Sequence, residues 1–296
     1  MKNLKNWGTG VALVTPFTSS GTVDKEGLFK LVEHCTQGGV DFLVAMGTTA
    51  ESATLSKSEK EEVVGWIIEA NTAKLPIVLG LGGNNTAAVI EELSNLNSEP
   101  FAAILSVAPY YNKPSQEGIF QHFKAIIDHS PLPVILYNVP GRTVSNISAE
   151  TCLRLAHYSK KVIAVKEASG NVTQISRILN GKPAHFEVLS GDDNLTFPML
   201  CMGAQGVISV SGQLACKAFS SMVEKTRMGH IEEARSIHFR LFELTELLFA
   251  EGNPAGVKSG LSHLGILNSG VRLPLVEATD SLSAQLVAAM RSANLM

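Results

Sequence analysis

Residues 162–170 read VIAVKEASG, so an apolar run leads directly into Lys166 and Glu167. A short, β-branched and continuously apolar run is typical of a parallel strand that is covered on both faces. A lysine that ends such a strand normally points to water, pairs with a carboxylate or stays neutral, because burying an unpaired ammonium is costly. The role of Lys166 therefore depends on the architecture around this strand.

Seven more runs of this kind occur along the chain. They cover residues 10–17, 41–47, 76–82, 102–109, 133–140, 186–193 and 206–211. Between them lie segments with apolar residues at helical spacing, for example residues 25–39, 57–71 and 115–130, the last with Ser115 as a predicted N-cap. Eight repeats of strand and helix, ending near residue 229, predict an α/β protein of the (β/α)8 or TIM barrel type. We expect residues 1–229 to form this barrel and residues 230–296 to add helices that pack on it.

A doubly wound nucleotide-binding sheet is the alternative fold. Its best support is the sequence GLGGNN at residues 80–85, within and just after the third predicted strand. This sequence lacks the third glycine of the GxGxxG motif, and no acidic partner of obvious role follows it. The barrel is therefore the predicted fold.

The bulk composition is that of an ordinary globular protein. The 296 residues are 45% hydrophobic and 17% charged, with a formal net charge of −3. The near-neutral charge without a Lys/Arg cluster argues against nucleic-acid binding, and no apolar run suggests a signal peptide or a membrane span. The four cysteines form no CxxC pair and the histidines no HxH or HxxxH pair, which argues against a disulfide framework and a zinc site. We expect a cytoplasmic protein that needs no metal or other cofactor and binds neither nucleic acid nor membrane.

Polar and small residues follow the predicted strands, where a barrel carries its active site. Lys166 lies on the sixth strand and Tyr137 on the fifth, while Thr48 follows the second strand and Tyr111 the fourth. Apolar walls around a lysine at this mouth favour its neutral amine, the form that attacks a carbonyl to give a Schiff base. Each residue alone also has a structural explanation, such as a core tyrosine at Tyr137 or a helix cap at Thr48. Their common position favours a catalytic site.

Six motifs near the strand ends carry a resemblance to a known family. In chain order they are GTTAES, APYYNKPSQEG, YNVPGRT, VKEASG, SGDD and GVISV. Together they resemble the dihydrodipicolinate synthases (4-hydroxy-tetrahydrodipicolinate synthases), within the class I pyruvate aldolase group that includes N-acetylneuraminate lyase. The resemblance runs from residue 8 to the late segments NPAGVKSGLSHLG and RLPL, so it covers almost the whole chain. YNVPGRT and YYNKPSQEG favour the synthases over the related lyases.

The resemblance implies a catalytic role for four residues. Lys166 would form the Schiff base with pyruvate. Tyr137 would move protons to and from that adduct, linked by Thr48 to Tyr111. In this family the residue at the Tyr111 position reaches into a neighbouring subunit's site, which implies a homodimer or a homotetramer built as a dimer of dimers.

The resemblance also implies contacts with two small-molecule substrates. Thr48 and Thr49 would hold the pyruvate carboxylate, and Arg142 would grip the carboxylate of L-aspartate 4-semialdehyde with its planar fork. Arg142 could otherwise be a surface charge. Gly191 and Ile208 would line the pocket through their backbone.

Two departures from the family pattern lead to further expectations. Ala50 stands where the family usually has glycine, so a positive φ there would cost on the order of 1 kcal/mol and reshape the loop. The positions that bind inhibitory lysine in sensitive members match at Ser52, Ala53, Asn84 and Tyr110. The histidine positions are Lys57 and Lys60, and the glutamate position is Ala88. Because a lost carboxylate and added positive charge disfavour a cationic ligand, we expect weak inhibition by lysine or none.

The implied activity is the condensation of pyruvate with L-aspartate 4-semialdehyde to 4-hydroxy-tetrahydrodipicolinate, a lyase reaction of lysine and diaminopimelate biosynthesis. An iminium on Lys166 acidifies the pyruvate methyl group, and the chain of hydroxyls can move the released proton without a metal. Two alternatives stay open: a lyase that releases pyruvate from a sugar acid such as N-acetylneuraminate or a 2-keto-3-deoxy sugar acid, and a non-catalytic barrel that binds a keto acid.

Overall fold

A computed structural model describes residue 4 and residues 7–296. Eight parallel strands form a closed barrel in chain order. This topology confirms the predicted fold and excludes the doubly wound alternative, whose sheet is open. The strands are β1 (Gly8–Ala12), β2 (Phe42–Ala45), β3 (Ile77–Gly80), β4 (Ala103–Val107), β5 (Val134–Asn138), β6 (Val162–Glu167), β7 (Glu187–Ser190) and β8 (Gly206–Ser209).

The first strand lies earlier in the chain than predicted. Residues 10–17 are the predicted strand, but β1 ends at Ala12. The Leu13 N–H still donates to Val44 O at 3.1 Å, while a side chain takes the backbone groups on either side of Leu13. The Gln213 side chain donates to the Ala12 carbonyl at 2.8 Å and accepts from the Val14 N–H at 3.0 Å. The apolar residues that follow are therefore buried without being part of the strand.

Helices follow the strands as the spacing predicts. The predicted N-cap Ser115 is confirmed, since its hydroxyl accepts from the Gly118 N–H. The helices are α1 (Lys25–Gln37), α2 (Lys57–Ala70), α3 (Thr86–Ser94), α4 (Gln116–His129), α5 (Pro140–Thr143), α6 (Ala149–Tyr158), α7 (Val172–Gly181), α8 (Thr196–Cys201), α9 (Cys216–Arg227), α10 (Ile231–Phe249), α11 (Ala255–His263) and α12 (Asp280–Ser292). Three short 3-10 turns are η1 (Thr48–Ala50), η2 (Asp193–Leu195) and η3 (Ser211–Gln213).

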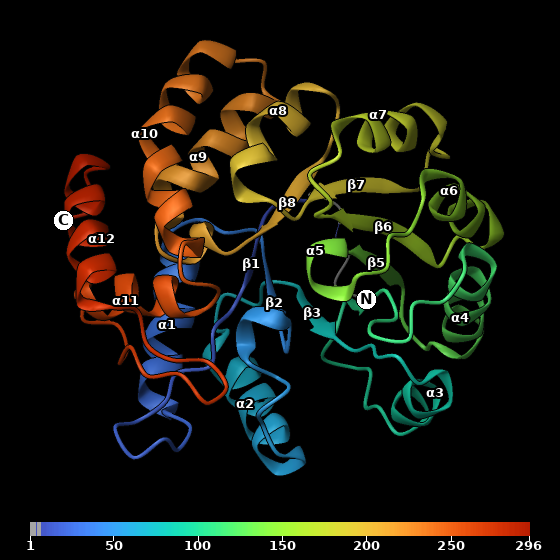
Figure 1. Ribbon diagram of the computed structural model, residues 1–296, viewed down its shortest axis with the longest axis horizontal. Helices are drawn as coiled ribbons and strands as arrows, with labels where there is room; N and C mark the ends of the chain where they lie inside the picture. The colour runs from blue at the N-terminus through green and yellow to red at the C-terminus, as the bar shows by residue number, and fades with distance from the viewer. Residues whose placement is uncertain (1–3, 5–6) are drawn as a thin grey trace. The chain divides into compact units, whose positions relative to one another are not determined.

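The chain divides into two compact units. The first contains Leu4, Trp7 and residues 76–208, and the second contains residues 8–75 and 209–296. In the first unit, β5 pairs with β6 and β6 with β7, while α6 packs on β6 and α7 on β7 (Figure 1). In the second unit, α10 packs against α9, α11 and α12. The boundary expected at residue 229 stays a prediction.

Nearly all residues of β4, β5 and β6 are buried. Burial on both faces of a strand explains the continuous apolar runs from which the barrel was predicted. In the described part of the chain, no helix has both the length and the apolar character that a membrane crossing needs.

Candidate active site

Lys166 and Tyr137 lie side by side on neighbouring strands of the first unit. The register pairs Tyr137 of β5 with Lys166 of β6, and the lysine Nζ is 4.4 Å from the centre of the tyrosine ring. Lys166 is only 6% exposed and Tyr137 7%. The structure therefore brings together two of the four predicted catalytic residues, as the strand-end prediction required.

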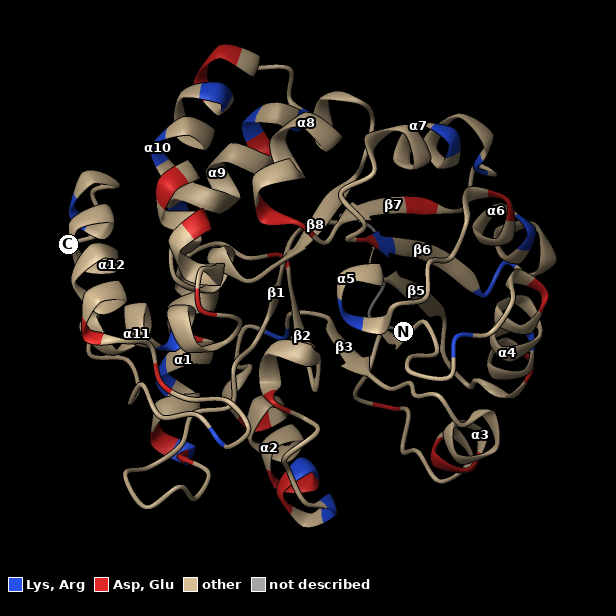
Figure 2. Cartoon of the chain, viewed as in Figure 1, with Lys and Arg blue, Asp and Glu red and all other residues tan. Residues whose placement is uncertain are grey.

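The carboxylate next to Lys166 in sequence points away from it. Glu167 accepts from the Asn138 side-chain amide at 3.0 and 3.1 Å, from Gln174 Nε2 at 3.1 Å and from the Ser169 N–H at 2.8 Å. Because successive strand residues point to opposite faces, these bonds hold Glu167 on the far side of β6 from the Lys166 amine. Figure 2 shows the basic and acidic neighbours at the end of β6.

Sequence reasoning missed this amide cage around Glu167. The signal was present in the paired strand ends YN and KE, at residues 137–138 and 166–167, where two polar residues in a row must face both sides of the sheet. Tyr137 and Lys166 face the candidate site, while the hydrogen bonds between Asn138 and Glu167 join β5 to β6 on the opposite face of the sheet. We interpret Asn138 and Glu167 as residues that fix the strand register at Tyr137 and Lys166.

Gly191 provides room for the lysine side chain. A Cβ atom at this position would lie 2.9 Å from Lys166 Cγ and 3.0 Å from its Cε. Any larger residue would therefore press on the lysine stem. Ile208, the other predicted pocket residue of this unit, is buried on β8.

Arg142 lies on α5, directly after β5, and the residue is exposed. Hydrogen bonds of Thr143 hold the end of this turn: its hydroxyl donates to Ser145 O at 2.8 Å and accepts from the Ser145 N–H at 3.2 Å. The next residue, Val144, has φ of +58° and is 63% exposed. A β-branched residue in the left-handed region is strained. The hydrogen bonds of Thr143 therefore hold the turn that carries Arg142 although the backbone conformation of Val144 is unfavourable.

We expect Val144→Gly to raise the free energy of unfolding by roughly 0.5–1 kcal/mol. Relief of left-handed strain contributes about 1–2 kcal/mol, and the greater unfolded-state entropy of glycine offsets about 0.5–1 kcal/mol of it. Urea unfolding measures the change. Val172→Gly is the matched control, because this exposed valine has no positive φ, and that change should destabilise. A loss of stability in Val144→Gly would contradict the strain.

Tyr111 extends from the loop after β4. Its φ is +72° and the residue is 88% exposed. The loop itself is fixed, since Asn84 Nδ2 donates to Tyr110 O at 3.2 Å and Asn112 Nδ2 donates to Asn84 O at 3.3 Å. An unfavourable backbone conformation therefore presents an aromatic ring to the outside of the chain.

Thr48 and Thr49 form the short turn η1 in the second unit. Asn253 Nδ2 donates to Thr49 Oγ1 at 2.9 Å, and Thr15 Oγ1 donates to Ala50 O at 2.7 Å. Since Thr49 Oγ1 already accepts a hydrogen bond from Asn253, its own O–H is left to donate elsewhere. Ala50 has no positive φ, so the expected strain at this position is absent; the left-handed residue of the loop is Glu51, with φ of +54°.

A buried ion pair fixes Glu51, and sequence reasoning missed it as well. Lys258 Nζ donates to Glu51 Oε1 at 2.5 Å and to Gly270 O at 2.8 Å, and the Arg272 N–H donates to Glu51 Oε2 at 2.9 Å. Lys258 is fully buried, and this burial lowers its pKa to about 8 although the Glu51 carboxylate opposes the shift. The available signal was Lys258 itself, a charge in the middle of the small and apolar residues AGVKSGL. The pair anchors the turn that carries both threonines.

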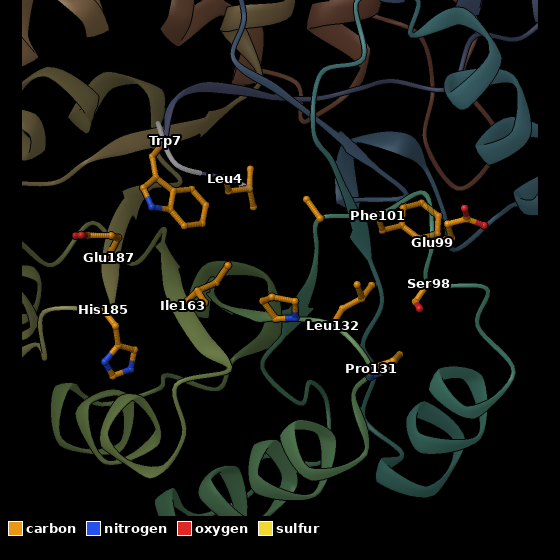
Figure 3. A pocket seen from close by; sticks show the side chains of 12 residues that line it. Leu4, Trp7, Ser98, Glu99, Phe101, Pro131, Leu132, Ile163, His185 and Glu187 are labelled. Carbon is orange, nitrogen blue, oxygen red and sulfur yellow. The ribbon is translucent and has the colours of Figure 1, made fainter. Parts of the chain in front are cut away.

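A cavity of about 500 Å³ lies in the first unit, at the other end of its strands (Figure 3). Leu4, Trp7 and Ile163 line it, together with Pro133 just before β5 and Glu187 at the start of β7. Ile163 lies near the start of β6, whereas Lys166 lies near the carboxyl end of the same strand. Because a parallel barrel carries its chemistry at the carboxyl ends of the strands, this cavity is not the candidate active site.

Comparison with known proteins places the chain in a family. The Dihydrodipicolinate synthetase family matches residues 5–293. The chain belongs to this family. A 4-hydroxy-tetrahydrodipicolinate synthase of Flavobacterium psychrophilum is 51% identical over 279 residues, which cover 94% of this chain and 95% of the relative.

Solved structures of dihydrodipicolinate synthases agree with the family assignment. The enzyme of Acinetobacter baumannii, complexed with pyruvate, has a TM-score of 0.94 and 37% identity, covering 98% of this chain and 99% of that one. The enzyme of Cyanidioschyzon merolae, with lysine bound, has a TM-score of 0.93 and 40% identity, also covering 98% and 99%. The whole length of the dihydrodipicolinate synthetase fold is therefore shared.

Proposed function

We propose that this member of the dihydrodipicolinate synthetase family condenses pyruvate with L-aspartate 4-semialdehyde to give 4-hydroxy-tetrahydrodipicolinate, as a lyase of lysine and diaminopimelate biosynthesis. The observation that carries the proposal is the buried pair of Lys166 and Tyr137, with an amine beside a phenol at the end of two parallel strands. An amine with a neighbouring proton carrier is what a Schiff-base aldolase requires.

Lys166 is the proposed nucleophile. Its neutral amine attacks the keto carbon of pyruvate, and loss of water leaves an iminium. The positive nitrogen acidifies the methyl group, whose proton departs to give an enamine. The enamine carbon then attacks the aldehyde carbon of the second substrate, whose oxygen takes up a proton to become the hydroxyl group. The amino group of the second substrate finally displaces the Lys166 amine from the iminium carbon, which closes the ring of the product and frees the lysine. Glu167 does not compete for the amine, because amide groups bind it on the other side of the strand.

Tyr137 is the proposed proton carrier, with its ring against the Lys166 amine. Thr48 and Tyr111 would continue the chain of hydroxyls. Thr48 and Thr49 would also hold the pyruvate carboxylate, and the Asn253 bond to Thr49 supports this role because it leaves the threonine O–H free to donate.

Tyr111 would complete the site of a neighbouring subunit. An exposed ring on a loop with an unfavourable backbone suits a residue whose contacts lie outside its own chain. We therefore propose a homodimer, or a homotetramer made of two dimers. A cytoplasmic location is proposed too, since all four cysteines are free thiols.

The experiment that tests the proposed function mixes the protein with pyruvate, reduces it with borohydride and maps the modified residue by peptide mass spectrometry. A reduced pyruvyl adduct on Lys166 is expected. Turnover with L-aspartate 4-semialdehyde is then compared with turnover of N-acetylneuraminate. No adduct would favour the non-catalytic binder, and an adduct with turnover of the sugar acid alone would favour the lyase.

Arg142→Ala is expected to lower kcat/KM for L-aspartate 4-semialdehyde by about 10²–10³-fold, because removing a charge-assisted bidentate contact costs about 3–4 kcal/mol. Pyruvate adduct formation should be unchanged, since the guanidinium would hold the second substrate only. Steady-state kinetics with both substrates measure the difference. Arg154→Ala is the control, because this exposed arginine binds Glu117 on the helical surface. Equal kinetics in the two variants would contradict the assignment of Arg142.

Lysine is expected to inhibit this enzyme weakly or not at all. Ala88 is an exposed residue of α3 that offers no carboxylate to a cationic ligand. Lys57 and Lys60, on α2, carry positive charge where sensitive members have a histidine. An inhibition curve over a wide range of lysine concentration measures the effect. Inhibition as strong as that of a lysine-sensitive relative assayed beside it would contradict the expectation.

A further inference from the structure

Two cysteines far apart in sequence meet between α1 and α9 of the second unit. Cys35 lies on the buried side of α1, and Cys216 is the first residue of α9. They are 0% and 3% exposed, and each thiol lies close enough to influence the pKa of the other. Gly38, the C-cap of α1 and three residues after Cys35, leaves room for Cys216, since an added Cβ there would lie 2.0 Å from the Cβ of Cys216.

The surroundings make the two thiols unequal. Cys216 stands at a helix N-terminus, where the exposed backbone N–H groups favour a thiolate. The neighbouring Cys35 thiol and His34 lower the pKa of Cys216, and the Cys216 sulfur also lies 3.5 Å from Gln213 O. The neighbouring Cys216 thiol and burial raise the pKa of Cys35. One sulfur is thus prepared to attack as a thiolate, and the other remains a thiol beside it.

We infer that Cys35 and Cys216 form an oxidisable dithiol, a modification site at which a hydroperoxide produces an intrachain disulfide. The Cys216 thiolate attacks the peroxide oxygen, which gives a sulfenic acid and releases hydroxide. The Cys35 sulfur then attacks the sulfenic sulfur, the S–S bond forms and the S–OH oxygen leaves as water. In total, two thiols and one hydrogen peroxide give one disulfide and two waters, and the two electrons come from the two sulfurs.

The other two cysteines provide internal controls. Cys152 is buried on α6, and burial strongly raises the pKa of its thiol, so it should resist oxidation. Cys201 is exposed and should react readily with a bulky maleimide, which the buried pair should not reach in the folded protein. A small neutral oxidant therefore distinguishes the dithiol from an ordinary surface thiol.

The disulfide would join the first helix to the segment after β8. That segment already contacts β1 through Gln213, whose side chain bonds to Ala12 and Val14. Since both helices belong to the same compact unit, the crosslink closes a long loop without requiring another chain. Its main effect should be on the unfolded state, so the oxidised protein should melt at a higher temperature than the reduced protein.

The test uses the full chain with Cys201→Ser, to prevent crosslinks between molecules. The reduced protein is treated with hydrogen peroxide, and the remaining thiols are labelled with N-ethylmaleimide under denaturing conditions. Peptide mapping without reductant should find Cys35 joined to Cys216 and Cys152 labelled, and dithiothreitol should restore the thiols. With Cys35→Ser, a dimedone adduct should collect on Cys216, and with Cys216→Ser, Cys35 should stay reduced. Oxidation of Cys152 as fast as the pair, or a pair that stays reduced, would overturn the inference.

Discussion

Lys166→Ala is expected to abolish the borohydride-trapped pyruvate adduct and to lower kcat/KM by on the order of 10³-fold or more. A covalent intermediate divides a difficult step into easier ones, and removing its nucleophile loses that whole route. Lys166→Arg should be as inactive, because a guanidinium keeps the charge but cannot become a neutral nucleophile. The positive charge alone is therefore not what the site needs.

The matched control is Lys160→Ala, on the exposed segment just before β6. It removes a lysine from the same strand connection without changing the Lys166–Tyr137 pair. Adduct formation and turnover should equal those of the unmodified protein. A persistent adduct in Lys166→Ala would show that another lysine reacts. Lys258 would be the first to examine, because it too is buried and burial lowers the pKa of its own amine.

The barrel was predictable because each strand carries its own signal. A strand buried on both faces must be apolar throughout, as Val134–Asn138 and Val162–Glu167 largely are, so eight such runs predict eight strands. The pairing of Tyr137 with Lys166 follows from the same fact. Residues at the carboxyl ends of adjacent parallel strands must lie close together, and the register confirms it.

Features that depend on distant residues could not be read in this way. Lys258 and Glu51 are 207 residues apart, and nothing local to either shows that they meet. Backbone strain is equally invisible: the sequence directed attention to Ala50, while the left-handed residues include Glu51, Tyr111 and Val144. Tertiary contacts set these conformations, so they follow from the fold rather than from local sequence.

Lys258→Met is expected to lower the free energy of unfolding by about 3–5 kcal/mol, because removing one partner of a buried pair leaves an uncompensated charge. The Glu51 carboxylate would keep its hydrogen bond from the Arg272 N–H but would lose the lysine ammonium. Urea unfolding measures the loss. Lys25→Met provides the control, since Lys25 and Glu69 form an exposed pair that should contribute less than about 1 kcal/mol.

The double variant Glu51→Gln with Lys258→Met separates the cost of the unpaired charge from the loss of packing. It should recover much of the stability, because a neutral amide is far less costly to bury than an unpaired carboxylate. If the double variant lost as much stability as Lys258→Met alone, packing rather than charge would be responsible for the loss. The ion pair would then not be what fixes the loop.

Lys258→Met also distinguishes the functions of the two buried lysines, Lys166 and Lys258. Lys258 holds Glu51, which follows the turn of Thr48 and Thr49, so its loss should loosen the proposed grip on the pyruvate carboxylate. The KM for pyruvate should then rise while borohydride still traps the adduct on Lys166. Lys166 would thus be buried in order to react, and Lys258 in order to hold a loop. An unchanged KM together with the expected loss of stability would leave Lys258 a role in folding alone.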